Sequence, residues 1–241
     1  MTGESLRKNR REAGWTQERL SARLGLTQEY VSLMERGRRP VPDHVAGAVA
    51  RLLSLPVTAL PLSESAINKA GPELWVEHAL ARLEYPGFAY RKKPGPQRNP
   101  AEVLLRALAC DKLDPRLIEG LPWLLLQFEG FDFETLSVSA KLKDLQNRLG
   151  FMVSLAREVA EQDPRWLHRT DELRRFEESL EPSRLAREDA FGAMAGSERM
   201  LDWLRNNRSK SAEHWNLLTD LKKEHLSYAG KDKGTVAQLP S

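Results

Sequence analysis

The residues with the clearest chemical potential lie on one side of a helix predicted over residues 27–36. Successive helical residues turn by about 100°, so side chains three and four positions apart share a face. The outward face carries the hydrogen-bonding side chains Gln28, Glu29, Ser32 and Arg36. Val31 and Met34 fall on the opposite, inward face. The pattern predicts a helix with one buried apolar face and one exposed polar face.

Hydrogen bonding to base edges is the chemistry that this polar face can perform. In a DNA major groove, Gln28 can pair with adenine and Glu29 can accept a hydrogen bond from the cytosine amino group. Leu33 lies at the edge of the same face and can contact a thymine methyl group. Because a recognition helix presents its N-terminal residues to the bases, we expect these three residues to read bases in double-stranded DNA.

The histidines and the cysteine do not form a pattern that binds a metal or a cofactor. The histidines that could be considered are scattered without a metal-ligand spacing such as HExxH: His78, His168, His214 and His225. Cys110 is the only cysteine, which excludes an intrachain disulfide and a cysteine cluster, and it is expected to be a packed residue. The nearby Asp111 and Asp114 are expected to form a turn and a helix cap. We therefore expect no metal and no cofactor.

Arg208 and His214 have an Arg-x5-His spacing that resembles HEPN-type ribonucleases. In such a site the two side chains would act on an RNA phosphate. The match rests on two positions in a chain with 37 Lys and Arg residues, so chance is favoured. We expect the protein not to be an enzyme, and an RNA-cleaving enzyme is the least favoured alternative.

The predicted recognition helix is one of four short helices that must pack together. Amphipathic segments separated by glycine or proline cover residues 6–13, 16–24, 27–36 and 43–53. Helices of this length are marginal in isolation and must pack on one another. Thr16 and Thr27 are expected N-caps, and Gly25 suits the left-handed end of the helix before the turn. The second and third segments therefore predict a helix-turn-helix.

The rest of the sequence predicts more helices and very little sheet. A helix over residues 73–83 precedes an irregular, basic and aromatic loop over residues 84–100. Later breaks are expected at Pro115, Pro122, Gly130, Pro164, Pro182 and Gly196. The longest helix is predicted over residues 137–161, with a buried stripe of Leu142, Leu145, Leu149, Val153, Ala156 and Ala160. The fold class is all-α, with an N-terminal helix-turn-helix bundle followed by a larger helical domain.

These elements divide the chain into four expected parts. Residues 1–62 form the helix-turn-helix domain, and residues 63–100 form a connector helix with a Pro/Gly-rich basic loop. Residues 101–230 form an all-α domain for oligomerisation or partner binding. Residues 231–241 form a flexible tail.

The N-terminal part also carries a dense set of motif positions. It reads GWTQERL at residues 14–20, LG at 24–25 and YVSLMERGRRP at 30–40. This stretch of about 60 residues resembles the phage-repressor and Cro-like, or XRE, family of helix-turn-helix transcriptional regulators. The resemblance implies that Gln28 and Glu29 read bases. It also implies a structural ion pair between Arg10 and Glu35.

Phosphate contacts are expected from residues around the recognition helix. The resemblance assigns such contacts to Gln17 and Ser32. Basic side chains that follow the helix can neutralise further phosphates, and Tyr30 can either pack or reach a phosphate. The full set of expected phosphate-contacting residues is Gln17, Thr27, Tyr30, Ser32, Arg36, Arg38 and Arg39.

The charge of the chain is small in total but unevenly distributed. The 241 residues hold 37 Lys and Arg against 34 Asp and Glu, a formal net charge of +3. Residues 1–60 hold 10 basic and 6 acidic side chains, a balance of +4, whereas residues 61–241 hold 27 and 28, a balance of −1. The basic excess is confined to the segment expected to meet phosphate, so binding should weaken as salt rises.

The expected partner is double-stranded DNA, read by a homodimer that regulates transcription, for instance as a repressor. The C-terminal helices are the expected dimerisation region. No run approaches the ~18–20 apolar residues that span a bilayer and no secretory signal is recognisable, so we expect a cytoplasmic protein without membrane contact. The alternative from a different class is an antitoxin that regulates its own operon and binds a toxin-like protein through the C-terminal helices.

Overall fold

The computed structural model describes residues 1–62, 72–91, 95, 97–192 and 198–229. The N-terminal unit, residues 1–55, consists of α1 (Gly3–Glu12), α2 (Gln17–Leu24), α3 (Gln28–Glu35) and α4 (Asp43–Leu52). Its own apolar core contains Leu6, Leu20, Val31, Met34, Val45 and Val49. The four helices predicted for this part of the chain are confirmed.

Local capping sets the turn between α2 and α3. The Thr16 hydroxyl accepts a hydrogen bond from the Arg19 amide at 3.0 Å, and the Thr27 hydroxyl accepts one from the Tyr30 amide at 3.2 Å. Gly25 ends α2 with a φ of 66°, a left-handed conformation that costs glycine little. Both predicted N-caps and the predicted glycine end are therefore confirmed.

The other described residues from 72 onward form the body of the molecule. Its α-helices are α5 (Pro72–Arg82), α6 (Pro100–Leu108), α7 (Pro115–Gln127), α8 (Phe133–Lys141), α9 (Gln146–Ala160), α10 (Thr170–Leu180), α11 (Glu198–Asn207) and α12 (Lys210–His214). The 3-10 helix η1 (Val57–Ala59) precedes the body, and the body contains the 3-10 helices η2 (Pro86–Arg91), η3 (Leu167–Arg169), η4 (Glu181–Ser183) and η5 (Lys223–His225). Two-residue strands β1 (Asp189–Ala190) and β2 (Leu217–Leu218) pair in parallel. Across the described residues the fold is all-α apart from this pair, as predicted.

Helix α9 forms the centre of the body. It packs against α7 and α10, and nearly all of its residues are buried. Gly150 lets the indole of Trp215 approach its backbone so closely that an added Cβ would lie 2.5 Å from the ring. The expectation of a single buried stripe was wrong, because neighbouring elements cover almost every side of this helix.

The predicted long helix over residues 137–161 was also wrong. The chain ends α8 at Lys141 and begins α9 at Gln146, with Asp144 in a left-handed conformation at a φ of 56°. The Leu145 amide donates to the Ala140 carbonyl, and the Asp144 amide donates to the Lys141 carbonyl, which together close a Schellman motif. Leu142, which was expected to be buried, lies on this turn with 81% of its surface exposed.

Two other expectations about element boundaries need correction. Pro122 does not break a helix but lies inside α7, where residues on both sides of it are buried. Packing in the core therefore outweighs the loss of one amide donor. Part of the segment expected to be an irregular loop, residues 84–100, forms the 3-10 helix η2. The break expected at Gly196 and the tail expected at residues 231–241 lie outside the described residues.

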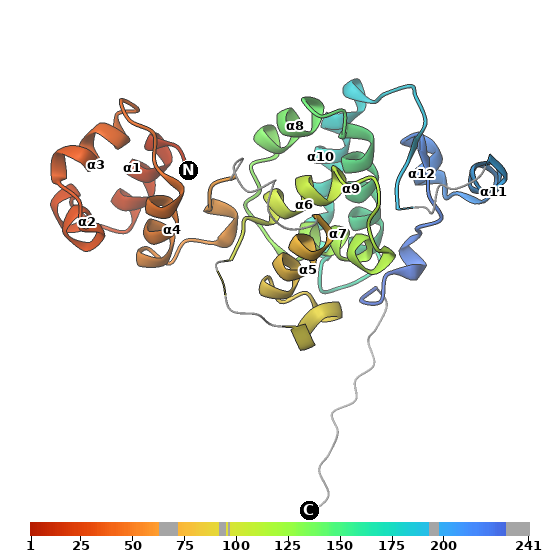
Figure 1. The fold of residues 1–241 in the computed structure, drawn as a ribbon, viewed down its shortest axis with the longest axis horizontal. Helices are drawn as coiled ribbons and strands as arrows, with labels where there is room; N and C mark the ends of the chain where they lie inside the picture. The colour runs from red at the N-terminus through yellow and green to blue at the C-terminus, as the bar shows by residue number, and fades with distance from the viewer. Residues whose placement is uncertain (63–71, 92–94, 96, 193–197, 230–241) are drawn as a thin grey trace, which may run out of the picture.

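The N-terminal unit lies at one end of the long axis of the molecule (Figure 1), with α2 and α3 on the side away from the body. The chain enters the body through η1, where the Thr58 hydroxyl donates to the Glu129 carbonyl at 2.9 Å. The buried Asn99 amide donates to the carbonyls of Thr58 at 2.8 Å and Leu60 at 2.6 Å. Helix α11 lies at the opposite end of the molecule.

Candidate nucleic-acid interface

The exposed face of α3 contains the side chains expected to read bases. Gln28 and Glu29 are exposed in the first turn of α3, and Leu33 is half-buried. Val31 and Met34 are fully buried beneath them. The structure therefore brings Gln28 and Glu29 together at the N-terminal end of a helix whose opposite face is fixed in the core.

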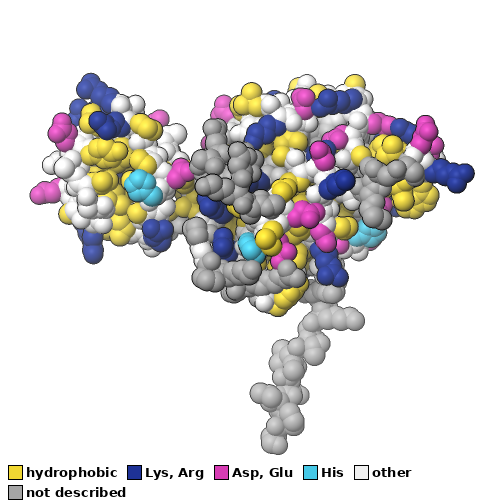
Figure 2. Space-filling view, in the orientation of Figure 1, with side chains coloured by type: hydrophobic (Ala, Val, Ile, Leu, Met, Phe, Trp, Pro, Cys, Tyr) yellow, Lys and Arg dark blue, Asp and Glu magenta, His cyan; other side chains and the backbone are white. Residues whose placement is uncertain are grey.

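Basic side chains gather at the other end of α3. Arg36, Arg38 and Arg39 are all exposed there. The Arg36 guanidinium donates to the Ser32 hydroxyl at 2.6 Å, and the Arg39 guanidinium lies over the Tyr30 ring, 5.4 Å from its centroid. Figure 2 shows Lys and Arg side chains at the upper edge of the N-terminal unit, near the loop that follows α3.

Ser32 was expected on the outward face of the helix, but this was wrong, because the structure buries it beneath Arg36. Only 8% of its surface is exposed, and its oxygen already accepts a hydrogen bond from Arg36. Thr27 is exposed, although its oxygen is used as the N-cap of α3. The phosphate contacts expected from Thr27, Tyr30 and Ser32 stay predictions.

A buried charged network holds α1, α2 and α3 together. Arg10 donates to both carboxylate oxygens of Glu35, at 2.5 Å and 2.9 Å, and to the Trp15 carbonyl at 2.6 Å. Gln17 donates to the same carboxylate at 2.8 Å. Burial opposes the ionisation of Glu35, but the hydrogen bonds from Arg10 and Gln17 outweigh it and hold the pKa of Glu35 below its ordinary value.

This network changes the interpretation of Gln17. The side chain was expected to contact a phosphate, and in the structure its amide nitrogen is bonded to Glu35. The contact also fixes the start of α2 against the end of α3, so Gln17 acts as a positioning residue in this conformation. The phosphate contact itself stays a prediction.

Arg19 is a further exposed cation that was missed from the sequence. Its guanidinium lies 4.3 Å from the centroid of the Trp15 ring, at the start of α2. The spacing of four residues between a tryptophan and an arginine is the signal that could have indicated this contact. Stacking on the Trp15 ring restricts the motion of the Arg19 side chain at the surface of the N-terminal unit.

The two residues considered for RNA cleavage pair with different carboxylates. The Arg208 guanidinium pairs with Glu188 at 3.1 Å, whereas the His214 ring bonds to Glu181 at 2.5 Å. Within the described part of the chain, no group of three or more His, Cys, Asp or Glu side chains could hold a metal ion. Cys110 is buried, and burial raises the pKa of its thiol. Asp114 caps α7 by accepting from the Arg116 amide at 2.8 Å, as predicted.

Comparison with known proteins agrees with this geometry. A helix-turn-helix family model matches residues 6–60, from within α1 to just past η1. The N-terminal unit is a helix-turn-helix domain. The expected resemblance to XRE-family regulators is therefore confirmed for this domain, and the family match ends before the body begins.

One curated relative of the helix-turn-helix domain is the "uncharacterized HTH-type transcriptional regulator y4dJ" of Sinorhizobium fredii (strain NBRC 101917 / NGR234). The two proteins are 49% identical over 39 residues, which cover 16% of this chain and 51% of the relative. This chain thus spans about half the length of that relative. No solved structure gives a significant match. Among the described residues, no helix has both the length and the apolar character needed to cross a membrane.

Proposed function

We propose that this protein is a DNA-binding transcriptional regulator that inserts α3 into the major groove. The observation that carries the proposal is the exposed polar start of α3 on a helix-turn-helix domain. Gln28 and Glu29 are free of the core, whereas the other side of α3 is buried. The name of the curated relative, a transcriptional regulator, agrees with this function.

Base reading and phosphate binding are divided between the two ends of α3 in this proposal. Gln28 and Glu29 face base edges, with Leu33 beside them. Arg36, Arg38 and Arg39 neutralise phosphates and provide affinity that depends on salt. The contacts of Arg36 with Ser32 and of Arg39 with Tyr30 support this division, because they restrict both guanidinium groups before DNA arrives.

We further propose that the protein acts as a homodimer in the cytoplasm. Two copies reading half-sites about one helical turn apart would gain affinity and register. The body is the proposed dimerisation region, since its helices lie outside the family match. Binding of a toxin-like protein by the same region, and the lack of enzymatic activity, stay predictions.

The test is selection of a bound sequence from random duplexes by the full chain, followed by footprinting and titration with salt. We expect one protected sequence, and a log-log plot of affinity against salt concentration with a clearly negative slope. Equal affinity for selected and scrambled duplexes would exclude sequence-specific reading. Affinity that does not change with salt would exclude phosphate binding by the arginines.

A further inference from the structure

A cavity of about 650 Å³ lies in the body between α11, the start of α7 and the segment that follows β2. Its apolar lining comes from Pro115, Ile118, Met200, Trp203, Leu204 and Leu221. These residues belong to segments far apart in the sequence, so the cavity is a product of the tertiary fold. Its volume falls in the range of sites that hold small organic molecules, about 300–1,000 Å³.

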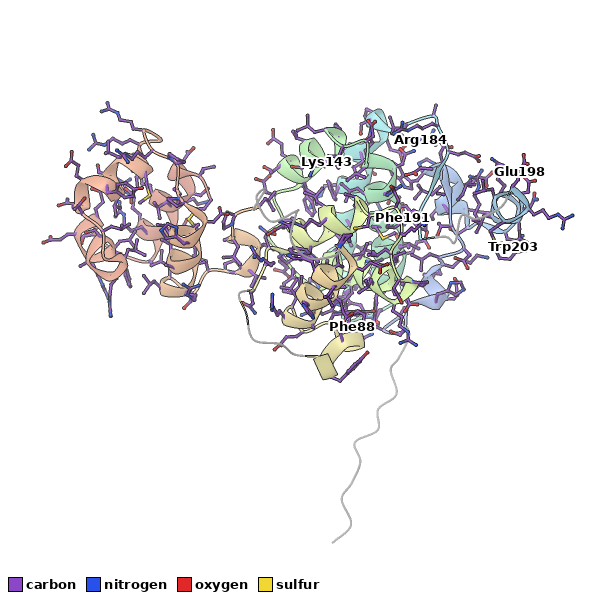
Figure 3. The ribbon with its side chains drawn as sticks, in the orientation of Figure 1. Phe88, Lys143, Arg184, Phe191, Glu198 and Trp203 are labelled. Carbon is purple, nitrogen blue, oxygen red and sulfur yellow. The ribbon has the colours of Figure 1, made fainter. Side chains whose placement is uncertain are left out.

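Helix α11 leaves large apolar side chains at the mouth of this cavity. Leu204 is its buried residue, whereas Trp203 is 51% exposed and Met200 is 38% exposed. Figure 3 shows Trp203 on the lower side of α11, at the end of the molecule away from the helix-turn-helix domain. Covering these two side chains with an apolar ligand would remove part of their apolar surface from water, which favours binding.

The polar lining of the cavity contains groups of both signs. Arg199 and His225 line it together with the acidic side chains of Asp220 and Glu119. Burial raises the pKa of the Glu119 carboxyl. Such a lining does not favour a strongly charged ligand of either sign.

Thr219 adds one oriented hydrogen-bonding group. It is 2% exposed, and its oxygen accepts a hydrogen bond from the Leu221 amide at 3.2 Å. Thr219 lines the cavity, and its hydroxyl donates no hydrogen bond within the described part of the chain, so it is free to donate to a ligand. A buried hydroxyl with an unused proton is the kind of group that orients a molecule in an otherwise apolar site.

We propose that this cavity binds a small, uncharged, mainly apolar organic molecule that carries one hydrogen-bond acceptor. The molecule packs between Ile118 and Leu221 on one side and Met200 and Trp203 on the other. Its acceptor receives the Thr219 proton. The site lies outside the helix-turn-helix domain, and its existence does not depend on the proposed DNA binding.

The experiment titrates the full chain with N-phenyl-1-naphthylamine, a neutral aromatic probe whose emission rises in apolar surroundings. We expect a saturable rise, and energy transfer from tryptophan that falls in the Trp203→Phe variant. In Trp203→Arg, a charge at the cavity mouth should weaken probe binding at least about tenfold. The matched control is Leu142→Arg, on the turn after α8, where the leucine is more exposed than Trp203 is. We expect this variant to bind the probe as tightly as the native chain does.

A second variant tests the depth of the site. Ile118→Phe introduces a larger side chain that fills part of the cavity. We expect weaker probe binding with the helical content retained. If this variant does not fold, probe binding by Trp203→Arg, which changes an exposed side chain, still tests the proposal. Absence of saturable binding to the native chain would overturn the proposal. Loss of binding in Leu142→Arg with retention in Trp203→Arg would do the same, because it would locate the probe on the α8 turn.

Discussion

Arg10 and Glu35 form a two-point ion pair that joins α1 to α3, with N–O distances of 2.5 Å and 2.9 Å. Their side chains are only 8% and 1% exposed. Because Glu35 lies in the last turn of α3, the pair fixes the helix proposed to read DNA against the first helix of the domain. Removing one partner would leave the other charge buried without a counterion.

We predict that Glu35→Ala destabilises the helix-turn-helix domain by about 3–5 kcal/mol, because the Arg10 guanidinium stays buried. Hydrogen exchange resolved on α1, α2 and α3 would measure the loss. The double change Arg10→Met with Glu35→Leu removes both charges and should recover most of the stability. A loss below about 1 kcal/mol in the single variant would show that the pair has little structural weight.

The lowered pKa of Glu35 predicts a loss of stability in acid. A group whose pKa is lower in the folded state stabilises the fold above its unfolded pKa, and that stability disappears as pH falls through the folded value. Protection of α3 against hydrogen exchange should therefore fall as pH drops below the ordinary glutamate pKa of 4.5. The Glu35→Gln variant should lose this pH dependence within α3. Identical pH profiles for α3 in both proteins would contradict the assignment.

The two ends of α3 should respond differently to substitution. Gln28→Ala should relax base choice at one operator position and cost about 1–3 kcal/mol on the selected sequence. Arg38→Ala should weaken binding to all sequences alike and reduce the salt slope by about one. Arg51→Ala is the matched control, since Arg51 is exposed in the last turn of α4, and this helix lies nearer the body than α3 does (Figure 1). Equal effects of the first two changes on selected and scrambled DNA would contradict the division.

Two helical glycines should give opposite results when changed to alanine. Gly150→Ala places a Cβ 2.5 Å from the Trp215 ring, and we expect destabilisation by about 1–3 kcal/mol through overpacking. Gly47→Ala in α4 meets nothing closer than an Arg51 guanidinium nitrogen at 3.7 Å. It should stabilise that helix by about 0.5–1 kcal/mol. Denaturant unfolding of both variants measures the free energy of unfolding. A Gly150→Ala protein as stable as the native chain would contradict the prediction.

Asn99→Asp tests the attachment of the helix-turn-helix domain to the body. The aspartate keeps the acceptor that caps α6 at the Ala101 amide, but it loses both hydrogen bonds donated to Thr58 and Leu60. We expect faster hydrogen exchange in η1 with unchanged protection of α6. Unchanged exchange in η1 would mean that Asn99 does not hold this segment.

Local signals made the helix-turn-helix domain predictable. Thr16, Gly25 and Thr27 fix helix ends through contacts within a few residues, and such contacts are visible in a sequence. The Gln17 contact with Glu35 joins residues 18 positions apart, so the amide was assigned only to a phosphate. The sequence carries no direct sign of such a pairing.

The body was harder to predict because tertiary contacts override local patterns there. Leu142 continues the three- and four-residue spacing of the predicted long helix, yet Asp144 turns the chain two residues later. Pro122 is a strong local breaker, but burial of its neighbours keeps α7 continuous. The cavity beside α11 combines residues from α7, α11 and the segment after β2, which periodicity cannot bring together.

Helices α3 and α11 lie at opposite ends of the long axis of the molecule (Figure 1). A DNA duplex on α3 and a small molecule beside α11 therefore do not compete for the same space, and a ternary complex is sterically permitted. Any influence of the molecule on DNA affinity must be a coupling free energy transmitted through the body, and it must act equally in both directions.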